Sequence, residues 1–126
     1  MKKNGFTLIE LLAVIVILAI IALIATPAVL NIIEDSKKSA AERSTEAAVK
    51  AGEIHYMSEI AKGNTVTNPL EITAANLKVD NKPSDGKVTV TVSADGQTVT
   101  VTATDLVFDT YTCDYDKTNG AVCTKN

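Results

Sequence analysis

Glu10 is the residue whose type and position most strongly indicate chemistry, because it is an acid inside an otherwise apolar stretch. A carboxylate removed from water is costly unless a positive charge lies against it. The residues before it form a short basic leader that ends at Gly5. A cut after Gly5 would create a positive partner, because the α-amino group of Phe6 in a neighbouring copy would become available. The alternative is that Glu10 lies near a membrane interface and stays hydrated.

The position of this cut distinguishes the leader from an ordinary secretory signal. A secretory signal is cleaved after its apolar segment, and a charge inside that segment is unfavourable. Here the lysines, Gly5 and the apolar run follow one another directly, so the natural cut precedes the apolar run. Without this pattern, Gly5 would simply be a flexible residue ahead of a helix.

The remaining side chains that could bind a metal or act in catalysis are few. Cys113 and Cys123 are too few for a four-ligand zinc site, and His55 lies far from both in sequence. A disulfide between the two cysteines is the simpler interpretation, and two free thiols are the alternative. His55 has no Ser, Cys or metal-ligating residue at a suggestive spacing, which favours a structural role over a catalytic one.

The element that carries Glu10 is long enough to cross a membrane. The apolar stretch covers residues 6–33, and at ~1.5 Å per residue it reaches ~42 Å, against a hydrocarbon core of ~30 Å. Lys2 and Lys3 precede it, and no basic residue follows before Lys37. This bias predicts that the N-terminus stays in the cytoplasm and that the rest crosses the cytoplasmic membrane, to a side where a disulfide can persist.

The helix is predicted to continue beyond the membrane to about residue 62, with Gly63-Asn64 as its stop and a kink at Pro27, which lacks a backbone N–H group. Apolar or small residues recur every seven positions along it, and we expect this seam to contact a sheet. The seam consists of Ile33, Ala40, Ala47, Ile54 and Ala61, with Ala51 and Met57 between them.

The C-terminal part of the chain has the pattern of an antiparallel sheet. Residues 63–86 are predicted as a connector, with a short helical turn near Thr73. From residue 87 valines alternate with threonines on either side of Asp95-Gly96, which predicts a hairpin with its valines facing a core. A third strand is expected over 106–113, and Asn119-Gly120 is a further turn. The predicted fold is therefore α+β: a long helix packed on a small antiparallel sheet.

The segment Lys2-Lys3-Asn4-Gly5-Phe6-Thr7-Leu8-Ile9-Glu10 resembles the prepilin leader and N-terminal helix of type IV pilins and their pseudopilin relatives. The resemblance covers residues 1 to about 30, and Pro27 falls where pilins commonly have a proline. It implies cleavage by a prepilin peptidase between Gly5 and Phe6, methylation of the Phe6 amino group, and assembly through Glu10. It also implies three regions: a leader (1–5), a transmembrane and filament-core half of the helix (6–33), and a globular head (34–126).

Some pilin-like heads bind calcium in C-terminal loops, so the resemblance makes Asp114, Asp116 and Asn119-Gly120 candidate calcium ligands. Their spacing does not fit an EF-hand loop and no glutamate ends it, so a hydrated acidic turn is favoured. The net charge of −3, without a basic cluster, argues against nucleic-acid binding. The resemblance implies a structural protein, so no cofactor and no enzymatic activity are expected. It also implies that a separate motor supplies the energy for polymerisation, since no phosphate-binding glycine loop is present.

The sequence thus predicts a structural subunit of a type IV pilus or pilus-like filament. Its expected partners are further copies of itself in a helical homopolymer, other pilins, the prepilin peptidase, and an assembly platform with its motor. One alternative is a pseudopilin of a type II secretion or DNA-uptake apparatus. An alternative of another class is an extracytoplasmic binding domain held by an uncleaved signal anchor.

Overall fold

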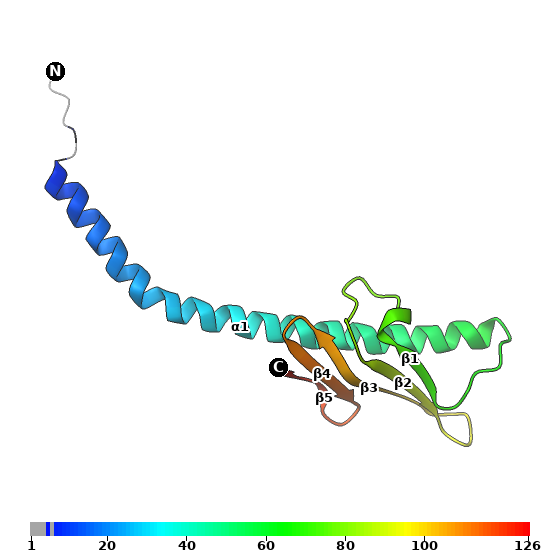
Figure 1. Ribbon diagram of the computed structural model, residues 1–126. Helices are drawn as coiled ribbons and strands as arrows, with labels where there is room; N and C mark the ends of the chain where they lie inside the picture. Colours follow the sequence, from blue (N-terminus) through cyan, green and yellow to red (C-terminus); the bar gives the residue numbers. More distant parts are fainter. Residues whose placement is uncertain (1–4, 6) are drawn as a thin grey trace. The chain divides into compact units, whose positions relative to one another are not determined.

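The computed structural model describes Gly5 and residues 7–126, and the chain divides into two compact units, Met1–Ser36 and Lys37–Asn126. We call the second the head unit. Figure 1 shows the elements in chain order. They are α1 (Leu8–Ala61), β1 (Leu70–Thr73), the 3-10 helix η1 (Ala74–Asn76), β2 (Lys87–Val92), β3 (Val99–Phe108), β4 (Tyr111–Asp116) and β5 (Gly120–Lys125).

Most of the described part of the first unit is the apolar stretch of α1, and no other described residues cover its large side chains. Every leucine, isoleucine and valine from Leu8 to Ile33 is exposed to solvent. By length and composition, α1 is the one helix in the described residues that could cross a membrane, and none of its most apolar segment is buried. So much exposed apolar surface needs lipid or other protein to cover it.

The end of α1 follows the prediction. Gly63 adopts a left-handed conformation with φ of 78°, and its N–H group donates to the carbonyl of Ile60 at 3.0 Å. The N–H group of Asn64 donates to the carbonyl of Glu59 at 3.0 Å. These two bonds form a Schellman cap, which satisfies carbonyls that the last turn would otherwise leave open.

In the described residues, the five strands form one antiparallel sheet in the order β1-β2-β3-β4-β5. The predicted hairpin is present as β2 and β3, with Val88 opposite Ala103 and Val90 opposite Val101. Val88, Val90 and Ala103 are buried, as the alternation predicted. The short helical turn expected near Thr73 is η1, which begins at Ala74.

Two sheet predictions were wrong. The connector contains β1, which pairs with β2, and the single strand expected over 106–113 is the end of β3, a turn and the start of β4. The turn is possible because Asp109 adopts a positive φ of 54°, which Asp tolerates better than most residues. Before it, a β-bulge between Ala103 and Leu106 shifts the alternation by one residue, so that Leu106 and Phe108 also face the core.

The predicted seam on α1 was also wrong. Its members in the head unit are exposed except for Ala51, which is half-buried, and Ile54 and Met57 are 57% and 54% exposed. The helix face that contacts the sheet is instead buried and made mainly of small residues: Ala41, Thr45, Ala48, Val49 and Gly52. A Cβ atom at Gly52 would lie 2.6 Å from Cγ1 of Val88. Small residues on this face therefore allow α1 to approach β2 closely.

Candidate functional site

The N-terminus of α1 is closed by a reciprocal pair of hydrogen bonds between Thr7 and Glu10. The N–H group of Glu10 donates to Oγ1 of Thr7 at 3.2 Å, and the N–H group of Thr7 donates to Oε2 of Glu10 at 3.3 Å. The carbonyl of Thr7 accepts the first helical bond, from Leu11, at 3.1 Å. Thr7 is therefore the N-cap, and the arrangement is a capping box.

This capping box gives Glu10 a role within its own chain that the sequence analysis missed. The signal was present, because Thr followed by an acid three residues later, just before an apolar run, is the sequence pattern of the motif. The negative charge also lies in the first helical turn, where the helix dipole favours it. The N–H group of Thr7 donates to only one carboxylate oxygen of Glu10. The other oxygen accepts no hydrogen bond from the described residues.

Gly5 lies just before the helix, is exposed, and has no structural need to be glycine. A Cβ atom placed on it would have no neighbour within 4 Å, and Gly5 is absent from the glycines with positive φ. Any requirement for glycine at this position would have to come from a molecule that binds the leader. The other residue of the predicted cut, Phe6, lies outside the described residues.

Pro27 lies within α1, which continues through it. Proline has no N–H group, so the carbonyl of Leu23 loses the donor that position 27 would otherwise supply. Immediately before it, Oγ1 of Thr26 donates to the carbonyl of Ala22. The proline and the threonine together weaken the regular hydrogen bonding of this turn, since a hydroxyl that bonds back to a carbonyl competes with the backbone ladder.

Residues 1–26 match the family model described as "Prokaryotic N-terminal methylation motif". The chain carries the type IV prepilin leader. No curated protein and no solved structure matches the chain. The leader implies a pilin-like or pseudopilin protein, and the proteins that carry it are structural, are processed by a prepilin peptidase and assemble into filaments. A long apolar helix packed on an antiparallel sheet is the pilin-like α+β arrangement that the resemblance predicted.

Cys113 and Cys123 form a disulfide between neighbouring strands, which fits a pilin-like head. The two residues lie directly opposite each other in β4 and β5, and both are buried. Thr45 of α1 lies over them, with its hydroxyl 4.0 Å from Sγ of Cys123 and donating to the carbonyl of Ala41 at 2.9 Å. The disulfide therefore holds the last strand to the sheet under the helix.

The acidic turn after β4 is built around Asp116. Its carboxylate accepts hydrogen bonds from the N–H groups of Thr118 and Asn119 at 2.8 and 2.6 Å, and from the side-chain amide of Asn119 at 3.0 Å. The backbone bond from Asn119, followed by the side-chain bond, lowers the pKa of Asp116 below its ordinary range. Asp114, on the same strand β4, accepts from the N–H group of Asp105 in β3 at 2.8 Å and so supports the β-bulge.

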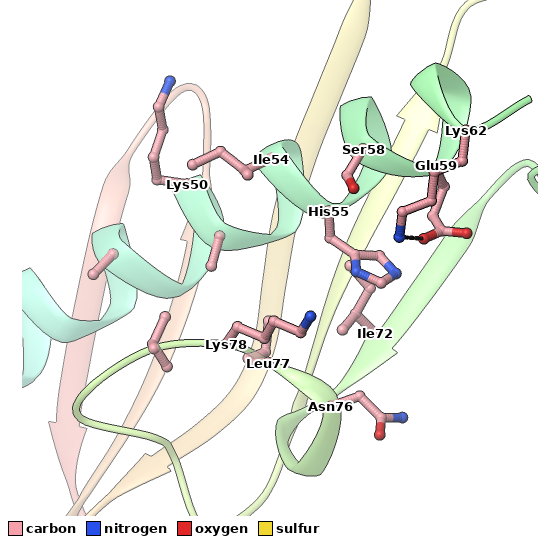
Figure 2. A pocket seen from close by; sticks show the side chains of 13 residues that line it. Lys50, Ile54, His55, Ser58, Glu59, Lys62, Ile72, Asn76, Leu77 and Lys78 are labelled. Atoms are coloured by element: carbon pink, nitrogen blue, oxygen red, sulfur yellow. Dashed lines mark hydrogen bonds and ion pairs between the residues drawn. The ribbon is translucent and has the colours of Figure 1, made fainter.

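His55, the only histidine, lies half-buried on α1 of the head unit. It lines a groove between α1 and the segment from Ile72 to Val79, together with Ile54, Ile72 and Leu77 (Figure 2). In the described residues, no group of three or more His, Cys, Asp or Glu side chains could hold a metal ion. The groove could not be predicted from the sequence, because β1 and η1, which contribute to its other wall, lie in the segment 63–86, whose local pattern indicates only a connector.

Proposed function

We propose that this protein is a structural subunit of a type IV pilus or pilus-like filament, assembled through its N-terminal helix after a prepilin peptidase cuts between Gly5 and Phe6. The observation that carries the proposal is the prepilin leader directly ahead of a helix whose large apolar residues are all exposed from Leu8 to Ile33. Before assembly, lipid would cover this surface, and in the filament the same helix of neighbouring copies would replace the lipid.

Processing and localisation follow from the same features. The lysines of the leader would hold the N-terminus in the cytoplasm, with a single pass through the cytoplasmic membrane and the head unit outside. The filament would then extend out of the cell. Partners would be further copies, other pilins, the peptidase, and an assembly platform with its motor. The disulfide supports an extracytoplasmic location, since oxidising compartments are where disulfides persist.

Glu10 would act in assembly as the acceptor for the Phe6 amino group of a neighbouring copy. Its carboxylate already accepts one hydrogen bond from Thr7 and has a second oxygen available. An ion pair in a filament core free of water needs both charges, and removing one partner of such a pair costs about 3–5 kcal/mol. The pair would therefore set the register in which a new copy joins the filament.

The first experiment tests cleavage. Mass spectrometry of the protein from membranes should give a mature chain that begins at N-methylated Phe6. Gly5→Leu should retain the leader, because the peptidase would require glycine at this position. The fold itself should be unaffected, since nothing in the protein's own fold requires glycine there. Asn4→Ala, in the same leader, should be processed normally. An unprocessed wild-type chain would refute the proposal and leave the signal-anchored binding domain as the better explanation.

The second experiment tests assembly and uses the capping box to choose the variant. Glu10→Ala would remove both the side-chain hydrogen bond of Glu10 in the capping box and the charge, so its failure would be ambiguous. Glu10→Gln removes the charge but keeps an oxygen that can accept from Thr7, because glutamine also serves in capping boxes. We expect Glu10→Gln to remain membrane-bound and processed while the yield of sheared filaments falls more than about tenfold, as a loss of several kcal/mol implies.

The matched control is Glu46→Gln, an exposed glutamate in the head part of α1. It should assemble like the wild type. If Glu10→Gln also assembles normally, Glu10 acts only as a helix cap and the proposed ion pair is wrong. Long filaments rich in this chain would identify a pilin, whereas only short fibres or a minor share would identify the pseudopilin alternative.

A further inference from the structure

The head unit has a groove with a volume of about 470 Å³ along one side of α1. One wall is the helix, from Ala47 to Lys62, and the other is the segment from Ile72 to Val79 (Figure 2). Its apolar lining comes from Ala47, Ala51, Ile54, Ile72, Leu77 and Val79. Ile54 is 57% exposed, so the groove offers apolar surface that the protein itself does not cover.

The charged side chains around the groove are mainly positive. Lys50, Lys62 and Lys78 line it, and Glu59 is the acid among its lining residues. Lys50 is paired with Glu53 at 3.3 Å, and Lys62 with Glu59 at 3.0 Å. Lys78 has no acidic partner among the described residues. A molecule that enters the groove would therefore need an apolar part for the floor and a negative charge near Lys78.

The same chain carries a surface with these two properties on the outward face of the sheet. That face is built largely of threonines on β2 and β3: Thr89, Thr91, Thr100, Thr102 and Thr104. Val122 of β5 breaks this polar pattern, because it lies opposite Asp114 in register and is 49% exposed. Asp114 and Asp116 lie on the same face by strand alternation, so an exposed apolar side chain is accompanied by two acids.

We propose that the groove of one copy receives the surface formed by Val122, Asp114 and Asp116 of the next copy, with Asp114 facing Lys78. We call this surface the Val122 corner. The proposal rests on the filament function above and adds a specific contact between head units. The two surfaces differ, so the contact is heterologous, the type of contact from which open helical polymers are built when the rotation between copies does not close a ring. Charge complementarity selects this occupant, because the groove is basic and apolar whereas the corner is acidic and apolar.

The first test exchanges charge across the contact. Val122→Lys would place a cation against the basic groove, and we expect filament yield to fall at least about tenfold, because like charges that face each other across an interface repel. Lys78→Glu in the same chain should restore the yield to within a few-fold of the wild type. Lys78→Glu alone should weaken assembly, since it would face Asp114. Neither substitution removes a hydrogen bond or a buried side chain of the head unit.

The matched control is Thr91→Lys, which adds the same charge to the same face of the sheet at an exposed position on β2. It should assemble normally. Val122→Lys with normal filaments, or a double variant that stays as poor as Val122→Lys, would overturn the proposed contact. Because the wild type is measured alongside, a wild type that forms no filaments would count against the filament function instead.

A second measurement does not depend on filaments. A photoreactive benzophenone side chain in place of Val122, in full-length protein in membranes, should cross-link to peptides from the groove walls of another copy, located by mass spectrometry. The same group at Thr91 should not give these products. Adducts of the Val122 variant with lipid or with another protein, and none with the groove, would assign the corner to a different partner and overturn the proposal.

Discussion

Gly86 offers the sharpest test of how the sheet is assembled. It lies between β1 and β2 with φ of 100°, and a Cβ atom there would lie 2.4 Å from the carbonyl oxygen of Asp105 and 2.7 Å from Cα of Leu106. Both are backbone atoms of the β-bulge, so they cannot rotate away. The N–H group of Val107 donates to the carbonyl of Asp85 at 3.1 Å, which ties the two segments together.

Gly86→Ala should therefore be strongly destabilising for two separate reasons. The positive φ costs an alanine about 1–3 kcal/mol. The collision with the bulge backbone adds about 1–3 kcal/mol, the usual cost of overpacking. Gly96→Ala is the matched control, because Gly96 has φ of 73° but a Cβ atom there would have no neighbour within 4 Å. The difference between the two variants isolates the collision.

The assay is thermal unfolding of the full chain in detergent, followed by the fluorescence of its three tyrosines, all of which lie in the head unit. For a domain of this size, 1 kcal/mol corresponds to about 4–8 °C in Tm. Gly86→Ala should therefore melt roughly 4–24 °C below Gly96→Ala. Equal melting temperatures would refute the close approach of Gly86 to the bulge, and with it the placement of β2 against β3 at this point.

Two further predictions concern the C-terminal hairpin. Replacing Cys113 and Cys123 together with alanine should lower the free energy of unfolding by roughly 3 kcal/mol, the loop-entropy value for a short closed loop, measured by denaturant titration. Because hydrogen bonds lower the pKa of Asp116 in the folded protein, the stabilisation is complete above its ordinary pKa of 3.8 and should be lost as the pH falls below it. Asp116→Asn should reduce this acid-dependent loss in melting experiments at successive pH values, and an unchanged pH profile would contradict it.

The parts of the fold that the sequence predicted correctly depend on local rules. The alternation of Val88 and Val90 with threonines needs only the two-residue period of a strand. The helix stop at Gly63 needs only the conformational freedom of glycine. The leader likewise consists of contiguous residues, and Gly5 and Glu10 are only five residues apart, so the candidate site could be recognised before any tertiary structure was known.

The parts that failed depend on contacts between distant segments. β1 has four residues and no clear alternation of apolar and polar residues. It forms a strand because its backbone pairs with β2. The bulge that redirects Leu106 is supported by Asp114 of the next strand, which no local pattern encodes. The groove could not be predicted for the same reason, since its second wall includes β1 and η1.

The error on the helix seam has a physical cause that bears on the proposed function. Apolar periodicity predicts a different face from the one that contacts the sheet, because close packing selects small residues such as Gly52, which lies against Val88, and the fully buried Ala48. The larger residues Ile54 and Met57 are left on the outside. A helix with one face fitted to its own sheet and another face of exposed large apolar residues is unfavourable for an isolated protein, because it leaves apolar surface in water. It suits a subunit whose second face is covered by neighbouring copies, which supports assembly through the head part of α1 as well as through the membrane part.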